Sequence, residues 1–212
     1  MEFFSFFDFF YAILLSFFLY FKAKKKYGEE GVNQYYSKGL LFKLIAVFIF
    51  CFIYMFYYQG GDTINYYQGI SAFYKLFWLD PSKFFSLILQ DSNYEYYLDF
   101  SINQVGFPPK YMFKDSRTLL VIKLSTILSF PGLGGYIATS VLLANLTYKW
   151  IWKGFEFVAT RYSTIQKLIA VSFLYLPSVV FWGSGIMKDT FSFAASCFAL
   201  YGINQIFVEK KK

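Results

Sequence analysis

Two polar stretches, far apart in the sequence, carry side chains that could act together on a phosphate-bearing substrate. Tyr57-Tyr58-Gln59-Gly60-Gly61-Asp62-Thr63 follows one apolar run, and Trp182-Gly183-Ser184-Gly185-Ile186-Met187-Lys188-Asp189-Thr190 ends another. A carboxylate can take a proton from a hydroxyl, and an ammonium group can neutralise a phosphate. We therefore predict that Asp62 and Lys188 face each other on one side of a membrane.

Asp62 is the predicted catalytic residue. Gly60 and Gly61 free the backbone beside it, so the chain can bend toward lipid headgroups and point the carboxylate into a cavity, where partial burial would raise its pKa. Asp62 could also help to hold a divalent cation such as Mg²⁺ or Mn²⁺. The chain has no histidine, so a metal would be a hard cation on carboxylates. The alternative is a solvated carboxylate at a helix end.

Lys188 is the predicted phosphate ligand. Asp189 would pair with it or cap the following helix, and Gly183-Ser184-Gly185 would allow close backbone approach. Arg117 is a second candidate for a phosphate contact. The alternative for Lys188 and Asp189 is an ordinary pair of opposite charges at a helix end.

Two further features are candidates. Asp8 lies within the first apolar segment, where an ionisable group is a functional hypothesis by default, although near the segment's end it could simply reach headgroups. Pro131-Gly132-Leu133-Gly134-Gly135 follows no strand, so it does not match the dinucleotide-binding fingerprint. We expect this run to let helices pack closely.

The composition indicates a helical membrane protein. Hydrophobic residues make up 57% of the chain and charged residues 16%, whereas a soluble domain carries about a quarter charged residues. The continuous apolar runs approach the roughly 20 residues that cross a bilayer and lack the alternation of barrel strands. We predict about five spans, at 3–21, 44–58, 130–150, 168–187 and 191–208. Lys43 would snorkel at the start of the second span and Pro177 would kink the fourth.

The charges predict the orientation. The stretches 22–43, 149–167 and 209–212 hold 13 of the 20 basic residues and four of the 13 acidic ones, and excess Lys and Arg marks the cytoplasmic side. The 59–129 connection balances six basic and six acidic residues. We therefore predict an inner (plasma) membrane protein with its amino terminus outside and its carboxyl terminus cytoplasmic. The net charge of +7 reflects this topology and not a nucleic-acid surface.

We predict one membrane domain, 1–212, in which 59–129 forms a cap on the outer face. Helical spacing of apolar residues over 64–79, 84–89 and 117–129 predicts short amphipathic helices in the interface plane. Gln90 to Pro109 reads as a polar loop. The fold class is thus all-α: a polytopic transmembrane helical bundle with interfacial helices on its outer face.

The Gly-Gly-Asp62-Thr-Ile-Asn-Tyr-Tyr and Leu176-Pro-Ser-Val-Val-Phe-Trp-Gly-Ser-Gly-Ile-Met-Lys188-Asp189 stretches resemble GT-C-type membrane glycosyltransferases. They also resemble bacterial polysaccharide polymerases and mannosyltransferase-like proteins. The resemblance covers roughly 55–80 and 168–195. It implies sugar transfer from a polyprenyl-phosphate-linked donor, with Asp62 as base or metal contact and Lys188 as phosphate contact. Such enzymes are longer and have more spans, so we expect an amino-terminal portion, a reduced relative or something else.

The predicted function is glycosyl transfer at the outer face of the inner membrane, for a cell-envelope polysaccharide or a glycosylated protein. Tyr66, Tyr67 and Trp182 would stack on sugar faces. The expected partners are membrane lipids, the polyprenyl-phosphate-linked sugar and other envelope membrane proteins, with no nucleic acid. Two alternatives remain. One is a non-catalytic subunit of an envelope or secretion complex that docks through the cap. The other is a small transporter that uses Asp8, Asp62 and Lys188 in its path.

Overall fold

The protein is helical throughout the part that the structure describes. The computed structural model describes residues 4–90, 98–100, 105–106 and 108–207, without the side chains of 112 and 113. Helices account for 85% of these residues, and no strand occurs among them. The predicted all-α class is therefore confirmed. Most of the predicted Gln90–Pro109 loop and the carboxyl-terminal lysines lie outside the described residues.

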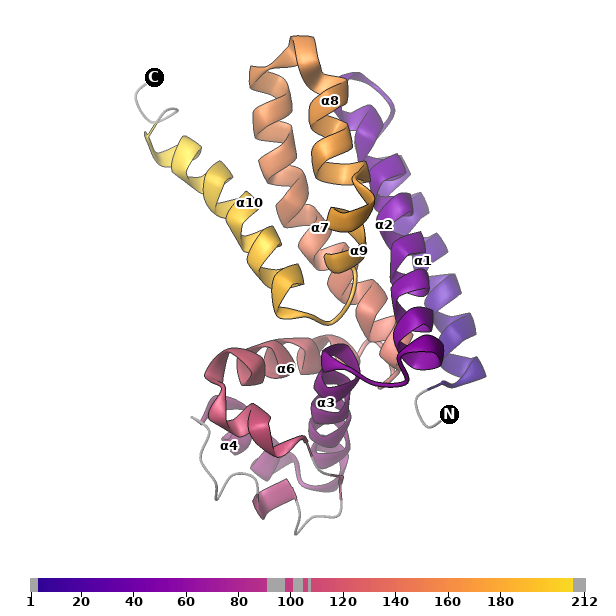
Figure 1. The fold of residues 1–212 in the computed structure, drawn as a ribbon, viewed down its shortest axis with the longest axis vertical. Helices are drawn as coiled ribbons and strands as arrows, with labels where there is room; N and C mark the ends of the chain where they lie inside the picture. The colour runs from indigo at the N-terminus through magenta and orange to yellow at the C-terminus, as the bar shows by residue number, and fades with distance from the viewer. Residues whose placement is uncertain (1–3, 91–97, 101–104, 107, 208–212) are drawn as a thin grey trace.

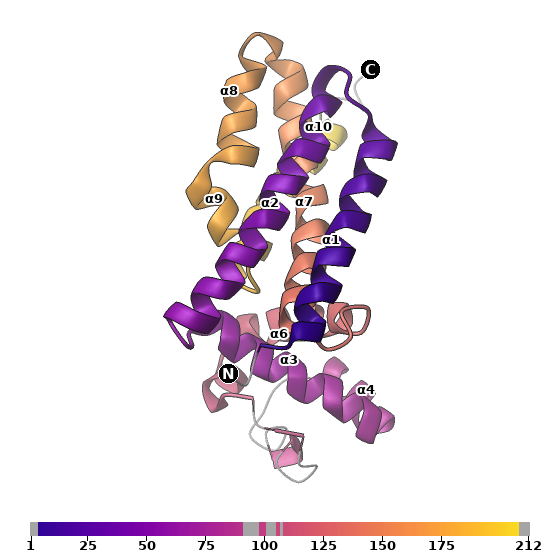
Figure 2. The same cartoon turned by 90° about the vertical axis from the view of Figure 1, so that its right-hand side faces the viewer.

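A long bundle forms one part of the molecule. Its helices are α1 (Phe6–Tyr27), α2 (Gln34–Phe52), α7 (Tyr136–Arg161), α8 (Gln166–Ala170), α9 (Pro177–Trp182) and α10 (Lys188–Phe207). They run alternately up and down the long axis, and α8 and α9 together make one broken element (Figures 1 and 2). The start of α1 and the end of α10 therefore lie at opposite ends of the bundle.

Three elements are long and apolar enough to cross a membrane: Phe6–Tyr27, Gly31–Tyr57 and Ser163–Trp182. This supports a membrane protein, but it does not confirm the five predicted spans, because α7 and α10 fall outside this set. The second half of α7 carries Lys149, Lys153, Glu156 and Arg161. Such charges lower the mean hydropathy of a helix whose first half is otherwise well suited to a bilayer.

The helix α7 lies at the centre of the bundle and packs against α1, α2, α6 and α10. Small and hydroxyl-bearing residues let the neighbours approach closely, and their hydroxyls donate to carbonyls of the preceding turn, as Thr147 does to Leu143 at 2.8 Å. The predicted third span was wrong at both ends. It begins at Tyr136 and not at Phe130, because Pro131–Gly135 forms a turn with Gly134 at φ 73°. It continues to Arg161 through a stretch predicted as loop.

The predicted fourth span is interrupted. A π-helical turn at Val171–Tyr175 ends at the extended residue Leu176, and α9 then begins at Pro177. Proline has no backbone N–H and disfavours helical geometry in the residue before it. The predicted kink at Pro177 is therefore confirmed, while the helix ends at Trp182 and not at Met187.

Lys43 does not snorkel to a membrane surface. Because α2 begins at Gln34, Lys43 lies in mid-helix, and the residue is only 4% exposed. Its Nζ donates to the Gly183 carbonyl at 2.5 Å. The ammonium group therefore binds the carboxyl end of α9, where the helix dipole favours a cation.

The cap lies across the end of the bundle at which α1 begins (Figures 1 and 2). It consists of α3 (Asp62–Leu79), α4 (Pro81–Leu89) and α6 (Ser116–Ser129), so helices are confirmed at the three predicted places. The predicted amphipathic pattern is wrong for α6, where Ser125 and Thr126 are buried while Leu120, Leu124 and Ile127 are exposed. Asp80 caps α4 by accepting from the Lys83 N–H at 3.0 Å. Gly69 lets α3 approach α6, since a Cβ there would lie 2.9 Å from Ile122. Large apolar side chains remain exposed around one hollow of the cap, which we call the apolar flank of the cap: Phe85, Leu89 and Ile127.

Candidate functional site

Asp62 is the first residue of α3, where the chain turns from the bundle into the cap. Gly61 makes this turn with φ 98°, and a Cβ there would lie 2.9 Å from the Tyr54 ring. The predicted bend of the chain is thus confirmed at Gly61. The Asp62 side chain is exposed, so the predicted partial burial of this carboxylate was wrong. Its place at the tip of the α3 amino terminus keeps it in contact with solvent.

Lys188 is the first residue of α10 and forms an ion pair with Asp115. Its Nζ donates to the Asp115 Oδ2 at 2.5 Å, and the two side chains are 37% and 40% exposed. Asp115 also caps α6, because its Oδ1 accepts from the Arg117 N–H at 3.0 Å. The predicted pairing of Lys188 with Asp189 was therefore wrong. Side chains at adjacent positions of a helix do not face each other, whereas Asp115 approaches from the cap.

The sequence carries a local signal for Asp115. Asp115-Ser116-Arg117-Thr118 precedes an apolar run, as helix-capping residues do. The Thr118 hydroxyl donates to Asp115 Oδ2 at 2.9 Å, so the carboxylate is held from α6 and α10 together. Nothing local in the sequence indicated that Lys188 would complete this arrangement from 73 positions away.

The charges of Asp62, Asp115 and Lys188 act on one another. Hydrogen bonds from Lys188 and Thr118 lower the pKa of Asp115. The hydrogen bond to Asp115 raises the pKa of Lys188, and the Asp62 carboxylate adds to this effect. Asp62 begins the cap helix α3, and Lys188 pairs with Asp115 at the start of the cap helix α6, so both side chains lie at the cap end of the bundle. Seven side chains make up what we call the cap-end cluster: Asp62, Asn65, Tyr66, Tyr111, Asp115, Thr118 and Lys188.

The loop between α9 and α10 holds Lys188 in place through tight contacts. Lys43 binds the carbonyl of Gly183, and the Thr190 hydroxyl donates to the Gly185 carbonyl at 2.7 Å. A Cβ on Gly185 would overlap the Phe50 ring of α2. The predicted close backbone approach at Gly183-Ser184-Gly185 is thus confirmed. This loop connects the bundle core directly to the cap-end cluster.

Asp8 lies on the other side of α3 and caps α7 from a distance in sequence. Its Oδ2 and Oδ1 accept from the backbone N–H groups of Ile137 and Ala138 at 2.8 and 3.0 Å. Asp8 is 5% exposed, so it does not simply reach headgroups. A Cβ on Gly135 would overlap the Asp8 carboxylate, which confirms close packing at the Pro131–Gly135 run.

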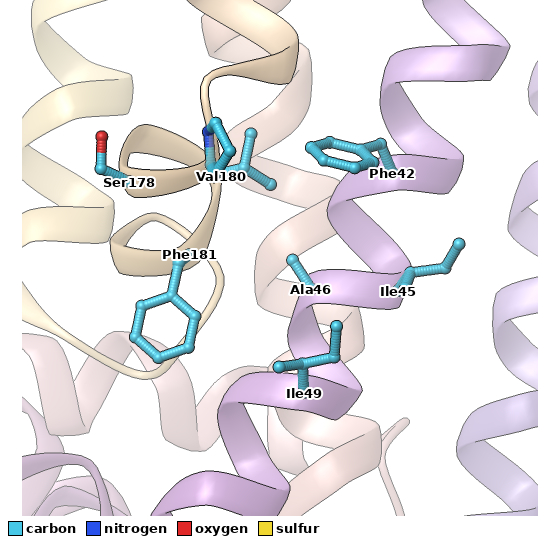
Figure 3. Close-up of a pocket in the computed structure, with 8 residues that line it drawn as sticks. Phe42, Ile45, Ala46, Ile49, Ser178, Val180 and Phe181 are labelled. Carbon is cyan, nitrogen blue, oxygen red and sulfur yellow. The ribbon is translucent and has the colours of Figure 1, made fainter.

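Three hollows are lined by residues other than Asp62 and Lys188. An apolar groove of about 410 Å³ separates α2 from α9, where Pro177 displaces the broken helix (Figure 3). Ile45, Ile49 and Phe181 line it, and the Ser178 hydroxyl is turned away from α2. A polar pocket of about 190 Å³ lies beside Asp8. A third hollow, of about 380 Å³, lies on the apolar flank of the cap.

No protein-family model, no curated protein and no solved structure matches this chain. The resemblance to GT-C-type glycosyltransferases therefore has no support from a match.

The three predicted sugar-stacking residues have different environments. Tyr66 is 3% exposed, and burial raises its pKa. Its ring therefore cannot stack on a ligand, and this prediction was wrong because the ring packs between α3 and α6. Tyr67 is half-buried and donates its hydroxyl to Gly134 at 2.6 Å, on the Asp8 side of α3. Trp182 is 47% exposed at the end of α9.

The remaining predicted site residues lie at helix starts. Arg117 is exposed in the first turn of α6, and Asp189 is exposed in the first turn of α10. The positive end of the helix dipole stabilises an acidic side chain such as Asp189 in the first turn of α10. Among the described residues, no group of three or more His, Cys, Asp or Glu side chains could hold a metal ion. The arrangement at Asp62 thus offers a base and a nearby cation.

Proposed function

We propose that this protein acts on a polyprenyl-phosphate-linked sugar at the cap end of the bundle, as a membrane glycosyltransferase. One observation supports the proposal: Lys188 pairs with Asp115, which caps the cap helix α6, and Asp62 begins the cap helix α3, so two residues from distant parts of the chain lie at the same end of the bundle. A base and a cation in one neighbourhood are the two charges that transfer of a phosphate-linked sugar needs.

The reaction divides between the two side chains. Asp62 is exposed and takes the proton of an acceptor hydroxyl, whose oxygen forms a bond to the anomeric carbon. The bond from that carbon to the phosphate oxygen breaks, and the leaving phosphate keeps the electron pair. Lys188 stabilises the charge that develops on this phosphate. The ion pair with Asp115 is more than one-third exposed, and exposed pairs are weak enough for a phosphate to compete.

The groove between α2 and α9 supplies a place for the lipid chain of such a substrate. It is lined almost entirely by apolar side chains and is about 410 Å³ in volume. Phe181 lies two residues before Gly183, which begins the loop to Lys188. A prenyl chain in this groove would bring its phosphate toward the cap-end cluster. Trp182 is the exposed ring best placed to contact the sugar.

Substitution of the two charged residues tests the proposal in cells that carry the complete protein. We expect Asp62→Asn to reduce surface glycan strongly on gels, because a general base contributes about 10²–10⁴-fold. Lys188→Ala should do the same. Asp115→Asn is the matched control, since it removes the ion pair and leaves the Lys188 charge for the phosphate. Normal glycan in Asp62→Asn and Lys188→Ala, with normal membrane levels, would rule out this function.

A non-catalytic subunit is the second candidate, and the apolar flank of the cap favours it. Phe85 and Leu89 are 56% and 84% exposed on α4, and large exposed apolar patches mark interaction sites. This candidate predicts the opposite result from the enzyme. Asp62→Asn would leave the glycan unchanged, whereas a Phe85→Ser, Leu89→Ser double variant would abolish it.

A further inference from the structure

The polar pocket beside Asp8 has a composition that suits a particular kind of ligand. It is about 190 Å³ in volume and lies where α1 begins, against the turn that precedes α7. Its lining combines one carboxylate, four aromatic rings and a glycine-rich turn: Phe4, Ser5, Phe7, Asp8, Tyr11, Tyr67, Gly132, Leu133, Gly134 and Gly135. The described lining contains no Lys or Arg, so an anionic ligand would find no counter-charge there.

Most hydrogen-bond donors of this lining are already used within the protein. The Tyr11 hydroxyl donates to Pro131 at 2.8 Å and the Tyr67 hydroxyl donates to Gly134 at 2.6 Å. The N–H groups of the Gly132–Gly135 turn donate to carbonyls of the same turn and of α6. Only the Ser5 hydroxyl remains as a side-chain donor. The pocket therefore offers hydrogen-bond acceptors and ring faces. A neutral polyol also needs hydrogen-bond donors and would bind poorly there, whereas a group that only donates hydrogen bonds would bind well.

The Asp8 carboxylate makes the pocket attractive to a cation. Its two backbone hydrogen bonds lie at the amino terminus of α7, which carries roughly half a positive charge, so part of its negative charge remains for a ligand. The Phe7 and Tyr11 rings stack with centroids 6.2 Å apart and planes 5° apart. Aromatic faces beside a carboxylate are the arrangement that holds an ammonium group.

The position of the pocket identifies the source of such a cation. Asp8 lies in the first turn of α1, and Lys24, Lys25 and Lys26 lie in its last turn. Sixteen residues of helix separate Asp8 from Lys24 by about 24 Å, which is close to the thickness of the bilayer core. If α1 crosses the membrane, the pocket lies at the headgroup level of the leaflet opposite these lysines.

We infer that this pocket binds the ammonium headgroup of a zwitterionic phospholipid, such as phosphatidylethanolamine. The inference uses neither Asp62 nor Lys188, so it stands or fails independently of the proposed enzymatic function. Such a lipid would fix the start of α1 against the turn before α7.

Lipid retention by the full chain tests this inference. The protein is placed in nanodiscs of equal phosphatidylethanolamine and phosphatidylglycerol, extracted into detergent and analysed by native mass spectrometry. We expect phosphatidylethanolamine to be retained in excess. Phe7→Ala should reduce the retained fraction roughly fivefold, as expected for losing one cation–π contact. Phe10→Ala is the matched control, because Phe7 and Phe10 are 67% and 61% exposed on α1 and only Phe7 lines the pocket.

Further arms separate the remaining outcomes. Asp8→Asn should also release the lipid, and if this variant does not assemble, the comparison of Phe7 with Phe10 decides. Equal retention of the two lipids, or equal losses in the two phenylalanine variants, would overturn the inference. Excess free ethanolamine that displaces the lipid completely would also overturn the assignment to a lipid, and would identify a small soluble amine as the ligand.

Discussion

At the scale of single residues, the molecule places three charged side chains where local sequence gives little reason to expect them. Asp115 joins Lys188, Asp8 joins the start of α7, and Lys43 joins the end of α9. Each of these groups binds a partner on another helix more than 70 positions away. A charge among helices needs such partners, because desolvation without compensation is costly.

The ion pair between Asp115 and Lys188 makes the stability depend on pH in a predictable direction. The pKa of Asp115 is lowered, mainly by its hydrogen bond from Lys188. Its stabilising effect is therefore present above the unfolded pKa of about 3.9 and is lost as the pH falls through the folded pKa. The pKa of Lys188 is raised by the same bond. Its effect is present below the unfolded pKa of about 10.4 and is lost as the pH rises through the folded value.

We expect the melting temperature of the wild type to exceed that of Asp115→Asn at neutral pH and to approach it on acidification from about pH 5 to about pH 2. Thermal unfolding of the detergent-solubilised protein, followed by tryptophan fluorescence, measures this difference. Asp189→Asn is the control, because this exposed acid lies at the start of the same helix as Lys188. A constant difference between wild type and Asp115→Asn across that range would contradict the assignment.

At the scale of elements, the loop between α9 and α10 decides where Lys188 lies. Pro177 interrupts the helical element that precedes the loop. Lys43 and Phe50 of α2 contact the loop, and α10 begins at Lys188. The loop backbone fits against α2 only without a side chain at Gly185. Because the loop packs tightly against the bundle core, the core fixes the position of Lys188 in the cap-end cluster.

Alanine substitution at two glycines separates packing from helix propensity. Gly185→Ala should destabilise the protein by about 1–3 kcal/mol, because its Cβ would overlap the Phe50 ring in a closely packed site. Gly202→Ala should be neutral or stabilising by about 0.5–1 kcal/mol, since Gly202 lies within α10 with nothing within 4 Å of its added Cβ. Denaturant unfolding in detergent micelles compares the two. Similar losses of stability in both variants would show that the Phe50 contact is unimportant.

At the scale of the whole molecule, α1 and the second half of α7 carry basic residues at the end of the bundle away from the cap. The last turn of α1 carries Lys24, Lys25 and Lys26, and the second half of α7 carries Lys149, Lys153 and Arg161. Both helices end at the end of the bundle away from the cap (Figures 1 and 2). An excess of basic residues marks the cytoplasmic side, so this segregation favours a cap on the opposite side.

Single-cysteine labelling tests that topology. We expect Glu29→Cys and Tyr162→Cys to react with a membrane-impermeant maleimide from one side, and Gln59→Cys from the other. All three positions are exposed in turns at the bundle ends. Replacing the buried Cys51 and Cys197 by alanine provides the background. Labelling of Glu29→Cys and Tyr162→Cys from opposite sides would contradict the alternating arrangement of α1, α2 and α7.

The success of the sequence predictions depended on whether the signal was local. The helices at 64–79 and 117–129, the bend at Gly61 and the break at Pro177 were predictable, because periodic apolar spacing, glycine freedom and the missing proline N–H act within a few residues. The start of α7 was not. The stretch after Phe130 is apolar enough to extend the span, but its glycines and Pro131 form a turn. The helix α7 begins after this turn, and Asp8 binds backbone N–H groups of its first turn.

The sequence by itself determined that this chain forms apolar helices, that one of them breaks at Pro177 and which stretches carry the charged side chains. These properties follow from composition and from spacing along one segment. Only the tertiary structure decided which groups meet: that Lys188 pairs with Asp115 and not with Asp189, that Tyr66 is buried, and that Asp8 binds α7. The physical reason is that helices position side chains along their own axis, whereas contacts between helices depend on how whole faces pack.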